Sequence, residues 1–187
     1  MRSDATRNAT AVVDAARAVF ADEGVDAPAK QITDAAGVGV GTLYRHFPRR
    51  SDLIVAVLQH EVDECIALAE TLADAADPWD AVVAFVDRFT RFVGTKQGLA
   101  EALHSGDAAY EGLPDLLLGQ LTPAFAELLA RAVDSGAARS DVEAREVLTG
   151  VAMLQHGVPG APAPLAPTLT RVFVDGLRTS TAIPVSR

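Results

Sequence analysis

The chain has 187 residues, of which 49% are hydrophobic and 22% charged, and its formal net charge is −9. This composition is typical of a soluble globular protein of one or two domains. The sequence contains no apolar run of eighteen residues, so we expect no transmembrane helix. The first residues lack the apolar core of a signal peptide, and the single cysteine, Cys65, excludes an intrachain disulfide. We therefore expect a cytoplasmic protein with no membrane partner.

The first three predicted elements are helices. Apolar spacing predicts a helix over about residues 6–22, with a stop at Gly24. A second helix is expected from Pro28, which suits a first helical turn, to Ala36. Gly37 then provides a turn, because glycine adopts positive φ at no steric cost. A third helix is expected over residues 40–46, and two helices joined by a short glycine turn form a helix-turn-helix pattern.

The third helix has two different sides. Val40, Leu43 and Phe47 follow helical spacing, so we expect them to anchor the helix to the domain. The other side carries small, hydroxyl-bearing and basic residues, which can approach phosphates and base edges of DNA closely. This side therefore predicts a DNA-reading helix.

The remaining chain also predicts helices joined by loops, and no strand pattern or internal repeat stands out. A long helix is expected over about residues 51–75, and Asp77-Pro78 is a strong start signal for the next one. The other expected helices cover residues 78–93, 99–103, the stretch from Leu113 to a stop at Gly136, a stretch opened by a capping box at Ser140–Glu143, and residues 165–179. We expect residues 157–164 to form a loop and residues 183–187 to be frayed. The total is about nine helices, an all-α fold.

Charge is unevenly distributed along the chain. Residues 1–50 hold seven Lys and Arg against six Asp and Glu, whereas residues 51–187 hold nine against nineteen. An acidic body repels DNA and leaves the N-terminal part as the docking surface. We expect residues 1–50 to form a helix-turn-helix DNA-binding domain and residues 51–187 a helical domain for ligand binding and dimerisation.

Several segments together resemble one known family. They are the helix Val12–Phe20 with Gly24, the run Ile32-Thr33-Asp34-Ala35-Ala36-Gly37-Val38, and the run Gly41-Thr42-Leu43-Tyr44-Arg45-His46-Phe47 with Leu53. Over about the first 58 residues, the chain resembles the DNA-binding domain of the tetracycline-repressor (TetR) family of bacterial transcriptional regulators. The resemblance implies a homodimer that binds a near-palindromic operator in double-stranded DNA and is released by a small molecule.

The residues expected to contact DNA surround the third helix. They are Lys30, Gly39, Val40, Gly41, Thr42, Tyr44, Arg45, His46, Arg49 and Arg50. The chain departs from the family pattern at Gly39, where Ser or Thr is usual, and at Val40, where a polar residue is common. Arg49 and Arg50 replace a small residue and Lys. For any one of these residues, the alternative is an ordinary solvated surface position.

Aromatic residues of the body are candidates for a ligand cavity, which the resemblance implies among the middle helices. The candidates are Trp79, Phe85, Phe89, Phe92, His104, Tyr110, Phe125, Met153 and His156. Plain core packing is the alternative for each of them. An apolar small molecule is the expected effector. The last two helices carry apolar stripes with the small residues Gly150 and Gly176, and are expected to pair with a second copy.

Two further classes of function remain open from the residues alone: an all-helical small-molecule-binding protein or enzyme, and a helical interaction module. The sequence shows no metal-ligand spacing, no phosphate-binding glycine loop and no nucleophile–base set, and its four histidines are scattered. We therefore expect no catalytic residues, no metal and no cofactor.

Overall fold

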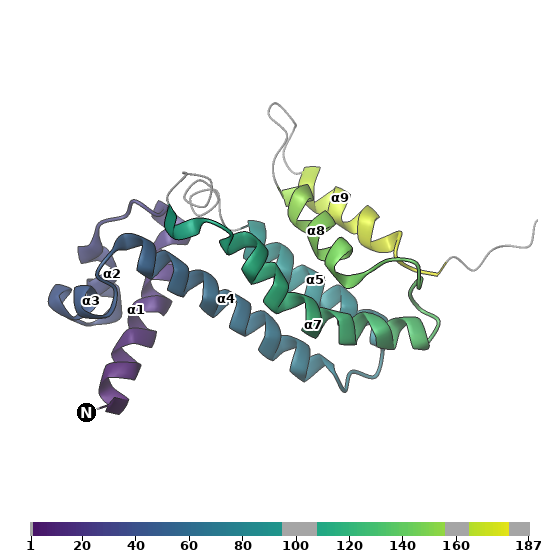
Figure 1. Ribbon diagram of the computed structural model, residues 1–187, viewed down its shortest axis with the longest axis horizontal. Helices are drawn as coiled ribbons and strands as arrows, with labels where there is room; N and C mark the ends of the chain where they lie inside the picture. The colour runs from purple at the N-terminus through teal and green to yellow at the C-terminus, as the bar shows by residue number, and fades with distance from the viewer. Residues whose placement is uncertain (1, 95–107, 156–164, 180–187) are drawn as a thin grey trace, which may run out of the picture. The chain divides into compact units, whose positions relative to one another are not determined.

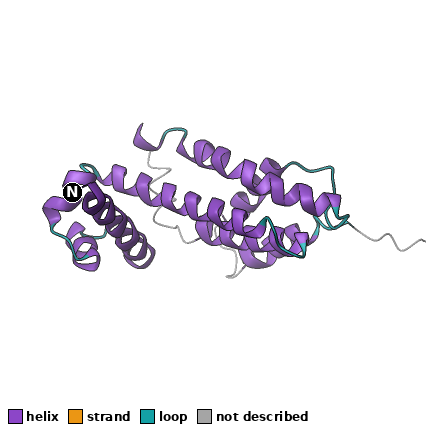
Figure 2. Cartoon of the chain, turned by 90° about the horizontal axis from the view of Figure 1, so that it is seen from below, coloured by secondary structure: helices purple, strands orange, loops and turns teal. Residues whose placement is uncertain are grey.

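The computed structural model describes residues 2–94, 108–155 and 165–179. The helices are α1 (Arg2–Glu23), α2 (Ala29–Ala36), α3 (Val40–His46), α4 (Arg50–Leu72), α5 (Pro78–Gly94), α7 (Leu113–Asp134), α8 (Ala144–Gln155) and α9 (Leu165–Asp175), with a 3₁₀ turn η1 (Ala108–Tyr110) (Figure 1). Within the described residues there is no strand, and an all-α fold is confirmed (Figure 2). The expected segments 99–103, 157–164 and 183–187 lie outside the described residues.

Several helix boundaries differ from the prediction, among them the start of α1, which is Arg2 rather than about residue 6. The capping box at Ser140 is wrong, because α8 begins at Ala144 and the Glu143 N–H instead donates to Glu146 Oε2 at 2.9 Å. The last helix ends at Asp175 rather than Thr179. Beyond it, Arg178 forms an isolated antiparallel bridge with Ala138, in which Thr179 N–H donates to the Ala137 carbonyl at 3.1 Å.

Other boundaries follow local signals. Helix α3 covers the predicted residues 40–46. The expected restart at Asp77 is confirmed, since Asp77 Oδ1 accepts the Trp79 N–H at 2.8 Å and caps α5. Helix α4 stops at Leu72, a little before the expected end. The carbonyls of Leu72 and Ala75 accept hydrogen bonds from the Arg131 guanidinium at 3.1 and 3.2 Å.

The chain forms two compact units. One comprises residues 1–64 and 94–117, and the other residues 65–93 and 118–187. Helices α4 and α7 each contribute to both units. These units are not the two domains expected from the sequence, and a functional division at residue 50 stays a prediction.

The first unit is built around α1. Its buried side chains include Val12, Ala16 and Phe20 of α1, Ile32 of α2, Leu43 of α3, and Leu53, Val57 and Leu58 of α4. Helices α1, α2 and α3 contact one another. Burial of these apolar side chains is the main favourable contribution to folding of the unit.

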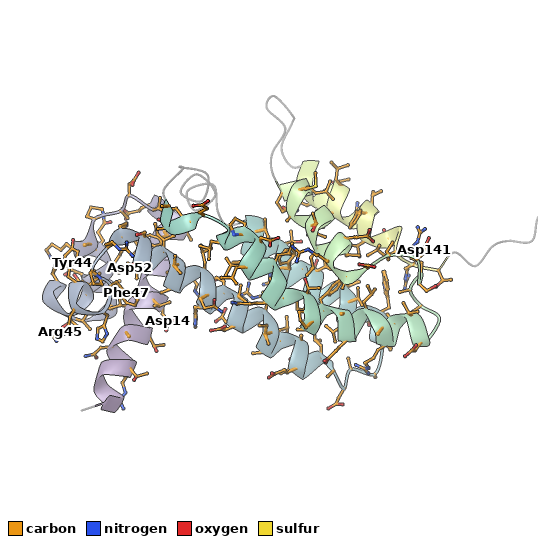
Figure 3. The ribbon with its side chains drawn as sticks, viewed as in Figure 1. Asp14, Tyr44, Arg45, Phe47, Asp52 and Asp141 are labelled. Atoms are coloured by element: carbon orange, nitrogen blue, oxygen red, sulfur yellow. The ribbon has the colours of Figure 1, made fainter. Side chains whose placement is uncertain are left out.

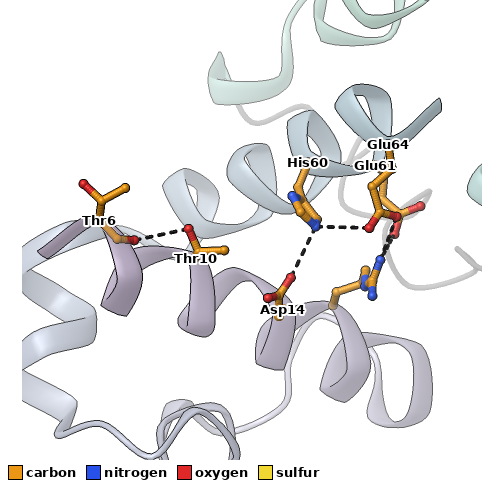
Figure 4. A network of polar contacts seen from close by, with 7 residues as sticks. Thr6, Thr10, Asp14, His60, Glu61 and Glu64 are labelled. Atoms are coloured by element: carbon orange, nitrogen blue, oxygen red, sulfur yellow. Dashed lines mark hydrogen bonds and ion pairs between the residues drawn. The ribbon is translucent and has the colours of Figure 1, made fainter. Parts of the chain in front are cut away.

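A polar network on one side of the first unit joins α1 to α4 (Figure 4). Arg17 Nη1 lies 2.9 Å from Glu64 Oε2 and 3.5 Å from Glu61 Oε1. His60 Nε2 lies 3.2 Å from Asp14 Oδ1 and 3.4 Å from Glu64 Oε1. The network joins α4 to α1, and α1 in turn contacts the helix-turn-helix helices α2 and α3.

The second unit has an aromatic core. Phe85 of α5 stacks on Phe125 of α7 with ring centroids 5.1 Å apart, and both side chains are fully buried. Helices α8 and α9 pack against each other where Phe173 lies over Gly150. Residues on more than one side of α5 are buried, which explains why its sequence is apolar beyond a single stripe.

One helical stretch, Ala108–Asp134, is long and apolar enough by length and composition to cross a membrane. A core helix of a soluble protein has the same length and apolar composition. Phe125, Leu121 and Leu128 on this stretch are buried inside the protein. The expectation of no membrane partner therefore stays a prediction.

Candidate nucleic-acid interface

A left-handed glycine joins α2 to α3. Gly37 has φ 67° and ψ 28°, and its N–H donates to the Asp34 carbonyl at 3.3 Å. The Val38 N–H donates to the Thr33 carbonyl at 3.1 Å, which completes the end of α2. A residue with a side chain would be strained at this φ. The turn predicted from the sequence is therefore present, and its geometry requires glycine at position 37.

Helix α3 is anchored by one side chain and exposes several others. Leu43 is 3% exposed, whereas Val40 is 42% and Tyr44 52% exposed. Gly41 and Arg45 are also exposed, and Figure 3 shows Tyr44 and Arg45 on this short helix. The expectation that Val40 anchors the helix is wrong, because Val40 shares the exposed face with Tyr44, four residues further along.

Two further predicted contact residues lie at the edge of this face. Thr42 and His46 are half-buried, and the His46 ring lies 6.3 Å from the ring of Phe47. Phe47 is itself half-buried and follows the end of α3. Partial exposure leaves the Thr42 hydroxyl and the His46 ring within reach of a ligand that docks on α3.

Two cations beside α3 are exposed and each faces a carboxylate. Lys30 Nζ lies 2.7 Å from Asp34 Oδ2, and Arg49 Nη2 lies 2.6 Å from Asp52 Oδ1. The hydrogen bonds from Arg49 lower the pKa of Asp52. The side chains of Lys30 and Arg49 are 76% and 72% exposed, so exchange of these partners for phosphate is sterically possible.

Arg50 is held inside the first unit. Its Nε donates to the Val25 carbonyl at 2.7 Å, and its Nη2 donates to the carbonyls of Val25 and Ala27. The guanidinium carbon lies 4.7 Å from the centroid of the Phe20 ring. Burial lowers the pKa of Arg50. These contacts give Arg50 a structural role, unlike the phosphate contact expected from the sequence.

Comparison with known proteins identifies the chain. The model of the bacterial regulatory proteins of the tetR family matches residues 12–57, and that of the C-terminal domain of SbtR-like transcriptional regulators matches residues 77–179. The chain belongs to the TetR family. The expectation raised by the helix-turn-helix residues is therefore confirmed at the level of family and fold.

Two solved structures illustrate the TetR fold over nearly the whole chain. A TetR transcription regulatory protein from Mycobacterium vanbaalenii is 34% identical, with a TM-score of 0.71, covering 95% of this chain and 99% of that one. A TetR transcriptional regulator from Streptomyces coelicolor is 32% identical, with a TM-score of 0.69, covering 92% and 99%. An HTH-type transcriptional regulator from Staphylococcus aureus is 29% identical over 109 residues, which cover 57% of this chain and 59% of the relative's length.

The residues expected to line a ligand cavity in this TetR-family chain are divided between the two units. Trp79, Phe85, Phe89, Phe92 and Phe125 are buried in the second unit, whereas Tyr110 is buried in the first. Met153 of α8 is 69% exposed. His104 and His156 lie outside the described residues. Among the residues that are described, no group of three or more His, Cys, Asp and Glu side chains could hold a metal ion.

Trp79 has a partner that the sequence does not reveal. The Arg178 guanidinium carbon lies 5.1 Å from the centroid of the Trp79 ring, which is 4% exposed. Both residues belong to the second unit. This contact favours core packing over ligand binding for Trp79, because a cation already covers the ring.

Sequence reasoning also missed the acidic residues of the interface. Asp34 lies four residues after Lys30, a helical spacing that indicates an ion pair in the sequence itself. Asp52 lies three residues after Arg49 at the start of α4, which is also a readable signal. The Arg17–Glu64 pair spans 47 residues, so no local pattern indicates it.

Proposed function

We propose that this TetR-family chain is a transcriptional repressor that binds operator DNA through α3. The observation that supports the proposal is the exposed face of α3, where Val40, Tyr44 and Arg45 project from a helix fixed by buried Leu43. An α-helix of this kind enters the major groove, and its exposed side chains contact base edges and phosphates. Since such binding takes place on the chromosome, we infer a cytoplasmic location.

A gel-shift or fluorescence-anisotropy titration against DNA upstream of the protein's own gene tests this proposal. Tyr44→Ala and Arg45→Ala should each weaken operator binding by about tenfold while thermal stability stays unchanged. Arg91→Ala removes an exposed cation from α5 and is the matched control, for which we expect unchanged affinity. Absence of sequence-specific, salt-sensitive binding at micromolar protein would refute the repressor proposal.

We propose that α8 and α9 form the dimer interface. Their exposed apolar side chains include Met153, at 69%, Val172, at 62%, and Leu169, at 38%. Helices α8 and α9 pack together, and exposed apolar residues on a pair of packed helices are typical of a surface covered by another protein chain. A symmetric dimer would present α3 twice, as a near-palindromic operator requires.

Analytical ultracentrifugation tests the interface. Val172→Glu and Met153→Glu should shift the protein from dimer to monomer, because a carboxylate would be buried without a partner. Leu116→Glu is the matched control, since Leu116 of α7 is an exposed apolar residue at 57% that lies on neither helix. A monomeric wild-type protein, or a dimer that resists both substitutions, would contradict the assignment.

We propose that an apolar small molecule binds among the buried aromatic residues of α5 and α7 and releases the operator. Two proteins of similar fold carry ligands: FadR from Bacillus subtilis, 17% identical, was solved with stearoyl-CoA, and SmeT, 17% identical, with triclosan. At this identity the likeness concerns the fold, so both molecules serve here as probes: stearoyl-CoA carries a long apolar chain on a charged CoA group, and triclosan is a compact aromatic molecule. Trp79 is the chain's single tryptophan and lies on α5, so its fluorescence reports on changes in the packing of this helix.

Each probe is added to the protein–operator complex while anisotropy and Trp79 emission are recorded. An effector should release the operator and change the emission together. Phe89→Ala, which opens the aromatic cluster without touching α3, should alter the probe concentration needed for release. Release that is equal in wild type and Phe89→Ala would argue against this location of the site.

A further inference from the structure

Two glycines, Gly39 and Gly41, lie on either side of Val40. Within the described residues, neither a backbone angle nor a close contact requires glycine at these positions. Gly39 has φ −77° and ψ 150°, an extended conformation that any residue adopts. Gly41 lies inside α3, and a Cβ atom on either glycine would meet no atom within 4 Å. Glycine inside a helix is less stable than alanine at the same position. The fold alone therefore gives no reason for Gly41.

At Gly37 and Gly150, by contrast, the structure of the chain itself disfavours a side chain. Gly37 has a φ of 67°, which disfavours any side chain. At Gly150, a Cβ atom would lie 2.7 Å from Cζ of Phe173. Neither condition holds at Gly39 or Gly41. The open space beside these two glycines is thus available to a molecule outside the chain.

Val40 stands between the two glycines as an exposed hydrocarbon side chain. It is 42% exposed, and the first turn of α3 carries no acidic residue. A valine offers no hydrogen-bond donor or acceptor to a base edge. Against guanine, adenine or cytosine, it would leave polar groups of the base without partners, which is unfavourable. In the major groove, the apolar group of the four bases is the 5-methyl group of thymine.

We propose that Val40 reads the 5-methyl group of a thymine in each operator half-site, and that Gly39 and Gly41 leave room for the duplex edge beside it. This inference rests on the proposed binding of operator DNA through α3. It adds the chemical identity of one base contact. The half-site should contain one thymine whose methyl group is important for binding, at the position that faces the start of α3.

Replacement of thymine by deoxyuridine tests the methyl contact, because it removes the methyl group and keeps every hydrogen-bonding group of the base. Each thymine of the operator is replaced in turn, at both symmetry-related positions. At one position the affinity of the wild type should fall by about fourfold per half-site, as expected for one methyl group that loses its apolar contact. Val40→Ala should bind the thymine and deoxyuridine operators with nearly equal affinity.

Tyr44→Ala distinguishes the contribution of Val40 to the thymine preference from that of its exposed neighbour Tyr44. This variant should bind more weakly overall and keep the fourfold preference for thymine at the same position. If the wild type binds the operator, but every deoxyuridine substitution affects Val40→Ala as much as wild type, the methyl contact is refuted and the proposed function survives. If the wild type shows no specific binding to any operator, the proposed function and this inference fall together.

The role of the glycines is tested by Gly41→Ala with Gly119→Ala as the matched control. Gly119 is an exposed glycine inside α7, and its Cβ would also meet nothing within 4 Å. Both substitutions should raise Tm by about 2–4 °C, because alanine is the better helix former. Gly41→Ala alone should weaken operator binding, by about tenfold. A stabilised Gly41→Ala protein with wild-type affinity would overturn the role of these glycines.

Discussion

Arg17 of α1 donates a hydrogen bond from Nη1 to Glu64 Oε2 of α4 over 2.9 Å, and its nearest oxygen of Glu61 lies 3.5 Å away. The Glu61 side chain is 12% exposed, so its charge depends on nearby cations more than a surface charge does. Arg17→Met removes the cation and keeps the apolar stem. We expect a loss of about 1 kcal/mol in the free energy of unfolding, a figure discounted for the 41% exposure of Arg17.

Lys30→Met is the matched control for Arg17→Met. The Lys30–Asp34 pair is exposed on both sides, at 76% and 64%, so its loss should change stability by no more than about 0.5 kcal/mol. Urea unfolding followed by circular dichroism, at low and high salt, measures both. Equal effects of the two substitutions would show that the α1–α4 network adds nothing beyond surface charge.

The close contact of Gly150 with Phe173 predicts that α8 does not tolerate the usual stabilising substitution. A Cβ at position 150 would lie 2.7 Å from Cζ of the ring, so the ring must move away. Gly150→Ala should therefore lower stability by about 1 kcal/mol, whereas Gly119→Ala should raise it by about 0.5–1 kcal/mol. Phe173→Leu, which shortens the side chain, should recover part of the loss in the double variant. Stabilisation by Gly150→Ala alone would show that the ring moves freely.

Substitutions of the adjacent residues Arg49 and Arg50 should have opposite effects on stability and operator binding. Arg50 donates to the carbonyls of Val25 and Ala27 and lies over Phe20, whereas Arg49 is 72% exposed. Arg50→Lys should lower the free energy of unfolding by about 1–3 kcal/mol, because an ammonium group cannot reproduce the planar fork. Arg49→Ala should leave stability within about 0.5 kcal/mol and weaken operator binding. Thermal unfolding and anisotropy on the same samples separate the two, and loss of affinity with full stability in Arg50→Lys would contradict its structural role.

Elements with strong local signals were predictable from the sequence. Gly37 indicated the turn, because the backbone there needs positive φ, and α3 follows as expected over residues 40–46. Asp77 indicated the start of α5, because a carboxylate two residues before a free N–H caps a helix. In both cases the physical cause lies within a few residues of the signal.

Features that depend on distant residues were not predictable in this way. Arg50 was expected to contact DNA. Its hydrogen-bond partners in the structure are the carbonyls of Val25 and Ala27, which lie 25 and 23 residues away in sequence, so no local pattern indicates them. The Ser140 capping box failed because the Arg139 N–H donates to the Leu177 carbonyl at 2.9 Å, and this pairing holds the segment outside a helix. Val40 was expected to anchor α3 because of its spacing to Leu43 and Phe47, but it is 42% exposed, and Leu43 is the buried residue of this helix.

The Arg139–Asp141 pair makes a prediction about acid pH (Figure 3 labels Asp141). Hydrogen bonds from the Arg139 guanidinium to both carboxylate oxygens, at 2.5 and 2.6 Å, lower the pKa of Asp141 to about 2. A carboxyl whose pKa is lower in the folded state stabilises the fold above its unfolded pKa of about 3.9. That contribution is lost as the pH falls from about 4 through 2.

Carboxyl ¹³C NMR titration of the folded protein measures this directly. In the wild type, Asp141 should titrate near 2, and in Arg139→Gln its pKa should rise toward about 3.9, because the amide provides no charge to hold the carboxylate. Asp141→Asn should make stability less dependent on pH between 2 and 4, since it removes a group that binds a proton more readily in the unfolded chain. Asp134→Asn at the end of α7 is the control for removal of one exposed carboxylate in the same unit. A wild-type Asp141 that titrates near 4 would show that the ion pair with Arg139 does not persist in solution.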